Sequence, residues 1–288
     1  MKALILGDIH GNLEAFQAVL GHAARMEGFQ EVWCLGDVVG YGPDPGACVD
    51  LLQEQSPVTV AGNHDRAAVG LLGLDEFNPY AAEACRWTAS KLSETQKTYL
   101  RGLPLVLTQG PFTLVHGSLR DPVWEYLLDA EAAQATLALL QTRRCLVAHS
   151  HIPFLCRDGS PYPLFERLPE AKPMPLGQGR AVVNPGSVGQ PRDGDPRAAY
   201  ILYDADAGSV TLHRVEYEIR ATQRKMAEAR LPVGACTQEH YHPKAEEIYY
   251  ITHGTGRMRI ESEEREVRAG DAIAIPPGRK HKLWNTSG

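Results

Sequence analysis

The sequence lacks the features that mark several large classes of protein. Its 29 lysines and arginines form no basic run, and 35 aspartates and glutamates give a formal charge of −6. This balance argues against a broad nucleic-acid-binding surface, although it is compatible with a nucleotide as ligand. No stretch reaches the ~18 apolar residues that a membrane span needs, so we expect no membrane association.

Disulfide and export signals are also missing. The six cysteines form no CxxC pair and no regular framework, which favours reduced thiols. Lys2 is followed by only a short apolar segment before Asp8, which does not fit a secretory signal peptide. We therefore expect a cytoplasmic protein. Its 288 residues allow more than one domain at roughly 100–200 residues each.

What the sequence does contain is one repeated local pattern, in which a short apolar run and a glycine accompany Asp, Asn or His. The five blocks are GDIHGN (7–12), LGDVVGYGPDP (35–45), AGNHD (61–65), VHGS (115–118) and AHSH (148–151). α/β sheets present ligand-binding side chains in this way, at the carboxyl ends of their strands. The donors are Asp8, His10, Asp37, Asn63, His116, His149 and His151. Seven donors suit two divalent ions roughly 3.5–4 Å apart, which is the usual apparatus for hydrolysing phosphate esters.

In this order, the blocks resemble the calcineurin-like metallophosphoesterase family. The segment NPGSVGQPRDGDPRAAYILYD (184–204) is similar to the bacterial phosphodiesterase-like branch of that family. The resemblance extends to about residue 225 and defines an expected domain at 1–226. It implies an α/β fold, a two-sheet α/β/β/α metallophosphoesterase sandwich. It also implies metal-dependent hydrolysis of phosphate esters, by a phosphatase or a phosphodiesterase.

The resemblance assigns metal ligands by motif. One ion would be held by Asp8, His10, Asp37 and His151, and the other by Asp37, Asn63, His116 and His149. Asp37 would bridge the ions, since a carboxylate has two oxygens. Mixed imidazole and carboxylate ligands suit manganese, iron, zinc, cobalt or nickel better than calcium. The alternative is that these residues cap turns and helices, as Asp and Asn often do.

The catalytic assignment rests on GNHD. By resemblance, His64 protonates the leaving oxygen as a general acid, Asp65 orients its ring, and a metal-bridging hydroxide is the nucleophile. A small phosphorylated compound or a nucleotide would be the substrate. Asn12 and Arg192 are candidate substrate contacts. For Arg192, as for Asn184 and Ser187, a structural role in the loop is an equal alternative.

Strands and helices are expected to alternate along the first domain. Helices are expected at 13–26, 45–55, 81–103 and 221–231, and strands at 31–36, 58–62, 181–186, 198–204 and 209–219. The helix at 81–103 is placed to wall the substrate site. The later strand-rich segments provide the strands of the two packed sheets.

Residues 229–288 differ from the preceding domain and resemble a small all-β cupin. The two motifs are G-x5-H-x-H-x4-E-x6-G (234–254) and G-x5-P-x-G-x2-H-x3-N (270–285). The ligands implied are His240, His242, Glu247 and His281, with Glu246 as a substitute. Such a set could hold one transition metal, or the site could be an empty vestige.

The cupin segment ends early, because three residues follow Asn285 where a cupin usually continues with further strands. We therefore expect its strands to be covered by the first domain, by missing downstream residues, or by a second chain in a homodimer. Two alternative functions follow from the same motifs. The first domain could be a non-catalytic regulatory module, or the cupin could be the enzyme and act on a sugar phosphate.

Overall fold

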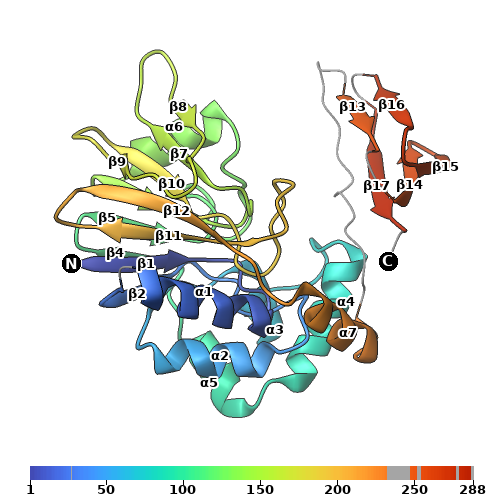
Figure 1. The fold of residues 1–288 in the computed structure, drawn as a ribbon, viewed down its shortest axis with the longest axis horizontal. Coiled ribbons are helices and arrows are strands. Elements are labelled where there is room, and N and C mark those ends of the chain that lie inside the picture. Colours follow the sequence, from blue (N-terminus) through green and yellow to red (C-terminus); the bar gives the residue numbers. More distant parts are fainter. Residues whose placement is uncertain (27, 232–246, 252–253, 277–278, 287–288) are drawn as a thin grey trace. The chain divides into compact units, whose positions relative to one another are not determined.

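The computed structural model describes residues 1–26, 28–231, 247–251, 254–276 and 279–286 (Figure 1). The chain divides into two compact units, Met1–Leu231 and Pro232–Gly288. No helix in the described ranges is both long and apolar enough to cross a bilayer.

The first unit contains two six-stranded sheets. The first sheet has the order β3-β2-β1-β11-β12-β9, in which β1, β2 and β3 run parallel and the other pairs are antiparallel. Its strands are β1 (Lys2–Leu6), β2 (Glu31–Cys34), β3 (Val58–Thr59), β9 (Met174–Pro175), β11 (Ala198–Asp204) and β12 (Ser209–Val215). Three consecutive carboxyl ends therefore meet at one edge of this sheet.

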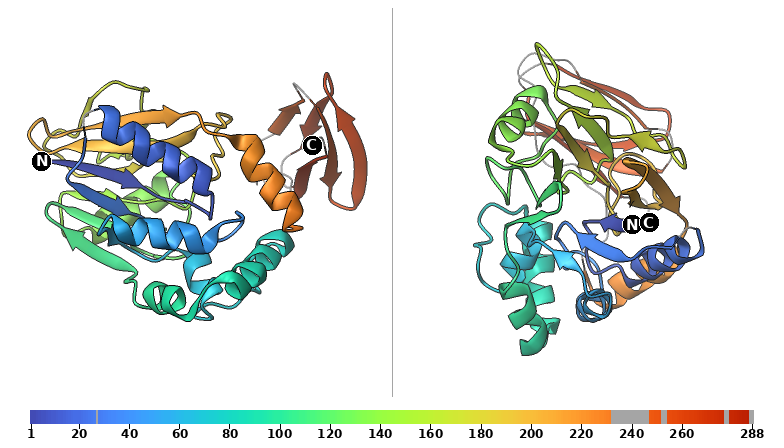
Figure 2. Two further views of the ribbon diagram at one scale, coloured as in Figure 1. Left: turned by 60° about the horizontal axis from the view of Figure 1, so that its bottom comes forward. Right: turned by 90° about the vertical axis from the view of Figure 1, so that its left-hand side faces the viewer.

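The second sheet has the order β4-β5-β6-β10-β7-β8, with β5, β6 and β10 parallel to one another. Its strands are β4 (Val106–Gln109), β5 (Phe112–Val115), β6 (Arg144–Leu146), β7 (Phe154–Arg157), β8 (Leu164–Glu166) and β10 (Ala181–Asn184). Figure 2 shows the two sheets stacked in layers, with helices α1 and α2 on the outer side of the first.

The alternation of side chains along β1 explains the layers. Ala3 and Ile5 belong to the core between the sheets, while Leu4 and Leu6 belong to the core under the helices. Successive residues of a strand point to opposite faces, so both faces of this strand must be apolar and covered. The helices α1 (Leu13–Met26) and α2 (Pro45–Glu54) cover the first sheet, and α6 (Ala130–Leu139) covers the second. The expected α/β/β/α sandwich is confirmed.

The expected single helix at 81–103 is wrong. The structure has α4 (Pro79–Lys91) and α5 (Glu94–Arg101), which follow the short α3 (Asn63–Ala68). The break has a local cause, a capping box at Ser93. The Ser93 hydroxyl accepts from the Gln96 amide at 3.2 Å, and the Gln96 side chain accepts from the Ser93 amide at 2.9 Å.

The last helix of the first unit, α7 (Ile219–Glu228), begins two residues before its expected start, and β12 ends earlier than expected at Val215. Lys225 on α7 forms ion pairs with Glu14 and Asp44, at 2.5 Å and 2.8 Å. These contacts attach α7 to the first turn of α1 and to the residue that caps α2. The first unit extends to Leu231, beyond the expected boundary near 226.

In the second unit, the described residues form two small antiparallel sheets, β13-β16 and β15-β14-β17. The strands are β13 (Glu247–Tyr250), β14 (Thr255–Ile260), β15 (Glu263–Arg268), β16 (Ala272–Ile275) and β17 (His281–Asn285). Met258, Val267 and Ile275 form its small buried core. This is the all-β segment that the sequence predicts.

Candidate metal centre

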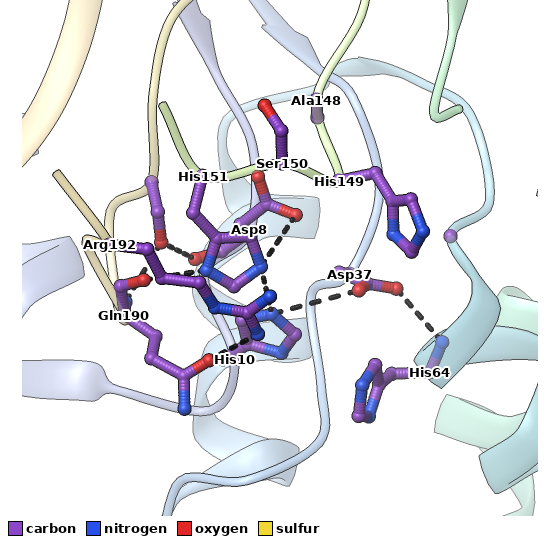
Figure 3. A network of polar contacts seen from close by, with 12 residues as sticks. Asp8, His10, Asp37, His64, Ala148, His149, Ser150, His151, Gln190 and Arg192 are labelled. Carbon is purple, nitrogen blue, oxygen red and sulfur yellow. Dashed lines mark hydrogen bonds and ion pairs between the residues drawn. The ribbon is translucent and has the colours of Figure 1, made fainter. Parts of the chain in front are cut away.

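The predicted ligands come from five loops at the carboxyl ends of parallel strands. Asp8 and His10 follow β1, Asp37 follows β2, Asn63 begins α3 after β3, and His116 follows β5. His149 and His151 follow β6. Figure 3 shows the side chains of Asp8, His10, Asp37, His149 and His151 converging on one region of the first unit. Sheet edges of this kind are where α/β proteins place their ligands.

The backbone at these positions is unusual. Five of the seven predicted ligands have positive φ angles: Asp8 (53°), His10 (50°), Asp37 (53°), His149 (64°) and His151 (61°). A side chain in this left-handed region costs about 1–3 kcal/mol and tends to occur at functional sites. Strain at five positions of one cluster indicates that the directions of these side chains are maintained despite an unfavourable backbone conformation.

Three groups of side chains have ligand atoms within 4.8 Å of one another and could each hold an ion. They are Asp8–His10–His151, His10–Asp37–His64 and Asp37–His116–His149. Asn63 joins the third group, because its Oδ1 lies 3.1 Å from His116 Nε2. All seven predicted ligands are thus brought together, and Asp37 belongs to two groups.

Each of the four candidate histidine ligands uses one ring nitrogen on a backbone carbonyl. The contacts are His10 Nδ1 to Val39 O (3.2 Å), His116 Nδ1 to Leu35 O (2.8 Å), His149 Nε2 to Trp124 O (3.2 Å) and His151 Nδ1 to Gln190 O (2.5 Å). A carbonyl only accepts, so these nitrogens carry the proton in a neutral ring. The other nitrogen of each ring then presents a lone pair, the arrangement typical of metal-ligating histidines.

The lone-pair nitrogens face one another. His10 Nε2 lies 3.2 Å from His151 Nε2, and His116 Nε2 lies 3.1 Å from His149 Nδ1. Burial lowers the pKa of His10, His149 and His151 well below its usual value and that of His116 to about 4, so the rings are neutral. Two neutral nitrogens that share no proton repel each other, whereas a cation between them is attracted by both.

The carboxylates also fit a cation. Asp8 is fully buried, and neither of its oxygens accepts a hydrogen bond within the described ranges. Burial raises its pKa well above the usual value and raises that of Asp37 to about 8. Burying an unpaired carboxylate is costly, and a divalent ion is the partner that such a group needs. The donor set therefore fits the metal ions that the motifs imply.

Asp37 lies between the two halves of the cluster. Its Oδ2 is 3.6 Å from His10 Nε2 and 3.5 Å from His116 Nε2, while its Oδ1 accepts from the His64 backbone amide at 2.9 Å. Gly62 packs directly against this carboxylate, and a Cβ there would collide with it. One carboxylate oxygen thus faces ligands of both predicted ions.

His64 occupies the same region but has different neighbours. Its Nδ1 lies 3.3 Å from Cys85 Sγ on α4, and its ring contacts those of His10, Tyr41 and Phe77. Burial lowers its pKa well below the usual value, and the charge of Arg192 acts in the same direction. Its grouping with His10 and Asp37 makes it a possible ligand as well as a possible general acid.

The role of Asp65 in orienting the His64 ring stays a prediction, while the contacts of its carboxylate are made with the backbone. Asp65 accepts from the backbone amides of Val39, at 3.1 Å, and Gly62, at 3.0 Å. These bonds cap the start of α3 and tie the loops after β2 and β3 together. Asp65 therefore shapes the site through the backbone, and Cys85 is the neighbour of the His64 ring.

Asn12, a predicted substrate contact, is buried and hydrogen-bonded within the protein. Its Oδ1 caps α1 through the Ala15 amide at 3.1 Å, and its Nδ2 donates to Gly189 O at 3.0 Å. The Thr222 hydroxyl on α7 also donates to it, at 3.1 Å. Both ends of its amide are occupied by protein, so these contacts support the loops around the site, and the substrate contact stays a prediction.

The polar residues of the 184–192 loop have two kinds of environment. Asn184 donates to Ala148 O at 2.8 Å, and Ser187 donates to Asp8 O at 2.9 Å, so both buried side chains hold the ligand loops in place. Arg192 differs, because it is exposed and its guanidinium donates to the Gln190 side chain at 2.7 Å, with the Tyr126 side chain as a further hydrogen-bond partner. Figure 3 shows it reaching toward His10 and His151. It remains a candidate phosphate contact.

The predicted cupin ligands are only partly covered by the structure. His240 and His242, with the alternative Glu246, lie outside the described residues. Glu247 begins β13, and His281 begins β17 as a buried residue whose Nδ1 lies 3.0 Å from Arg279 O. The metal site of this unit therefore stays a prediction.

We expect Gly40→Ala to reduce phosphoesterase activity at least tenfold, because a Cβ at Gly40 would collide with the His64 ring. Gly70→Ala is the matched control. Gly70 also has a positive φ, 77° against 93°, but nothing lies within 4 Å of a Cβ there. Backbone strain should cost each variant about 1–3 kcal/mol, and the collision with His64 adds to that loss only in Gly40→Ala. Equal activities in the two variants, measured beside thermal unfolding, would show that the His64 position is unimportant.

A sandwich of two mixed sheets with a buried His and carboxylate cluster at its strand ends defines a metallophosphoesterase-type protein. Residues 1–208 match the calcineurin-like phosphoesterase superfamily domain, and the chain belongs to that family. Residues 227–288 match the cupin domain. Both resemblances noted in the sequence are thereby confirmed.

Three relatives illustrate the similarity. A protein of Methanocaldococcus jannaschii described as uncharacterized is 35% identical over 79% of this chain and 93% of its own length. The crystal structure of a metallophosphoesterase from Sphaerobacter thermophilus has a TM-score of 0.73 and 43% identity, covering 81% of this chain and 95% of that one. A symmetrical bis(5′-nucleosyl)-tetraphosphatase of Haemophilus ducreyi is 30% identical over 49% of this chain, which spans only 54% of that relative.

Proposed function

We propose that the first unit hydrolyses phosphate esters with two divalent metal ions, held by the seven predicted ligands, of which Asp37 is one. The single observation that carries this proposal is the paired arrangement of inward-facing histidine nitrogens and buried carboxylates on both sides of Asp37. When bound, such ions supply Lewis-acid stabilisation and lower the pKa of a coordinated water. Manganese, iron, zinc, cobalt and nickel are the candidate ions.

His64 is the proposed general acid. Its ring lies beside the cluster, and its backbone amide is held by Asp37. Burial and Arg192 disfavour the protonated ring. The negative charge of a bound phosphate acts in the opposite sense and raises the pKa of the ring toward the range that proton donation requires. Arg192 is placed to hold a phosphate oxygen, since a guanidinium can donate two parallel hydrogen bonds.

A small phosphorylated compound or a nucleotide is the proposed substrate. Support comes from the relatives named as bis(5′-nucleosyl)-tetraphosphatases, about half of whose length this chain spans. The proposed function is tested by measuring hydrolysis of a panel of phosphomonoesters, phosphodiesters and dinucleoside polyphosphates. Hydrolysis should require added manganese or a similar ion and should be abolished by a chelator. Activity that survives thorough metal removal would contradict the proposal.

We further propose that the cupin segment pairs with that of a second chain. Its described strands form two sheets of only two and three strands, and small sheets need covering. Light scattering should show a dimer for the full chain and a monomer for a version ending at residue 231. A full chain that is monomeric rules out this pairing. A dimeric truncated form would move the interface to the first unit.

A further inference from the structure

Four aromatic side chains beside the candidate metal centre have no assigned role. Tyr41 lies in the loop after β2, Phe77 lies just before α4, and Trp124 and Tyr126 lie between β5 and α6. No motif in the sequence marks Phe77, Trp124 or Tyr126, and segments far apart in the chain supply these rings. We call the four residues the aromatic rim.

The rim forms a nearly continuous series of ring contacts with the site residues. Tyr41 lies 4.5 Å from His64, His64 lies 5.0 Å from Phe77, and Phe77 lies 4.8 Å from Trp124, measured between ring centroids. The series continues from Trp124 to His149 at 6.4 Å. Tyr126 stacks on His149 at 4.1 Å with an interplanar angle of only 10°. The rim therefore adjoins both the proposed general acid and a proposed ligand of the second ion.

The exposure of these rings distinguishes them from core aromatics. Trp33 and Phe112 are fully buried between the sheets, whereas all four rim side chains remain partly exposed. A partly exposed aromatic ring keeps apolar surface in contact with water, and covering that surface is favourable.

A cation lies next to the rim. The charge of Arg192 acts on both Tyr41 and Tyr126, and Tyr126 is also a hydrogen-bond partner of its side chain. Partly exposed rings, a guanidinium and a metal cluster are therefore adjacent. Metal ions and a guanidinium bind phosphate. Aromatic side chains stack against planar rings, including any nucleobase. The ligand that satisfies all three is a phosphate ester joined to a planar heterocycle.

We propose that the aromatic rim stacks against a nucleobase and makes the phosphoesterase site selective for nucleotide-containing esters. This inference rests on the proposed function and adds the residues that would determine its specificity. Base stacking on aromatic side chains tolerates any base, so the rim should favour nucleotides over other phosphates without selecting one base.

Two diesters with the same leaving group test the inference. One is the 4-nitrophenyl ester of thymidine 5′-phosphate, and the other is methyl 4-nitrophenyl phosphate, which lacks the nucleoside. We expect kcat/KM of the wild type to favour the thymidine ester. Trp124→Ala and Phe77→Ala should each reduce that preference about fivefold or more, the lower end for one base–aromatic stack. Phe77→Leu, which keeps apolar volume, guards against a loss of folding.

Trp87→Ala is the matched control. Trp87 is also partly exposed in the same unit, but its ring is near Lys91 Nζ, at 5.3 Å, and has no place in the rim series. The preference for the thymidine ester should be unchanged in this variant. A preference that is unchanged in both rim variants, or reduced equally by Trp87→Ala, overturns the proposal.

A binding measurement separates this inference from the proposed function. Titration calorimetry on the manganese-loaded full chain should show tighter binding of adenosine 5′-monophosphate than of ribose 5-phosphate, and Trp124→Ala should remove the difference. If no ester is hydrolysed but the difference is present, the proposed function fails and the rim assignment stands. If esters are hydrolysed and the two ligands bind equally, the rim assignment is wrong.

Discussion

Asp37→Asn should lose metal from both positions at once and reduce turnover more than about 100-fold. The Oδ2 atom of Asp37 faces His10 on one side and His116 on the other, so the substitution alters ligands of both ions. Residues that merely orient a ligand change metal affinity or activity by roughly 10–100-fold, and the loss of a shared ligand should exceed that range. Elemental analysis after dialysis, together with turnover at saturating manganese, provides the measurement.

Asp44→Asn is the matched control for this variant. Asp44 lies in the same loop after β2, but its carboxylate pairs with Lys225 on α7 and takes no part in the cluster. This variant should keep its full metal content. If Asp37→Asn lost only one ion, Asp37 would be an ordinary ligand and the bridging assignment would be wrong.

His64→Ala and His64→Gln should lower turnover by about 10²–10⁴-fold while both ions stay bound. The physical reason is the loss of proton donation to the leaving oxygen. Esters with good leaving groups need less protonation, so their hydrolysis should decline least. Turnover on a series of aryl phosphates of graded leaving-group pKa, with metal content measured in parallel, gives the result.

His22→Ala is the matched control for the His64 variants, because His22 bonds the Tyr200 hydroxyl at 2.8 Å and belongs to none of the candidate metal groups. It should have wild-type turnover. The structure also groups His64 with His10 and Asp37 as possible ligands. A metal content that falls together with activity would therefore assign His64 to the metal instead of the leaving group.

The sequence predicts the sandwich and the ligand cluster well because both depend on short local patterns. Each predicted ligand lies in the loop or helix start that follows a strand, and parallel strands bring such residues to one edge of a sheet. The break between α4 and α5 was also readable, since Ser93 and Gln96 form a capping box in the sequence. The expectation of one helix over 81–103 did not take this capping box into account.

Other features depend on contacts that no local pattern reveals. Asn12 is held by Thr222, which is 210 residues away in the chain, and Asp65 accepts from the amide of Val39 in a different loop. The aromatic rim joins Tyr41 to Trp124 through rings from separate segments. These arrangements arise from the packing of loops, so they become visible only once the sheets bring those loops together.

The most direct test of the central claim is anomalous diffraction from crystals of the full chain grown with manganese. The account predicts two anomalous peaks in the first unit, roughly 3.5–4 Å apart, with the Asp37 carboxylate between them. One peak should adjoin Asp8, His10 and His151, and the other should adjoin Asn63, His116 and His149. A single peak, or no peak among these residues at saturating manganese, would contradict the two-metal site.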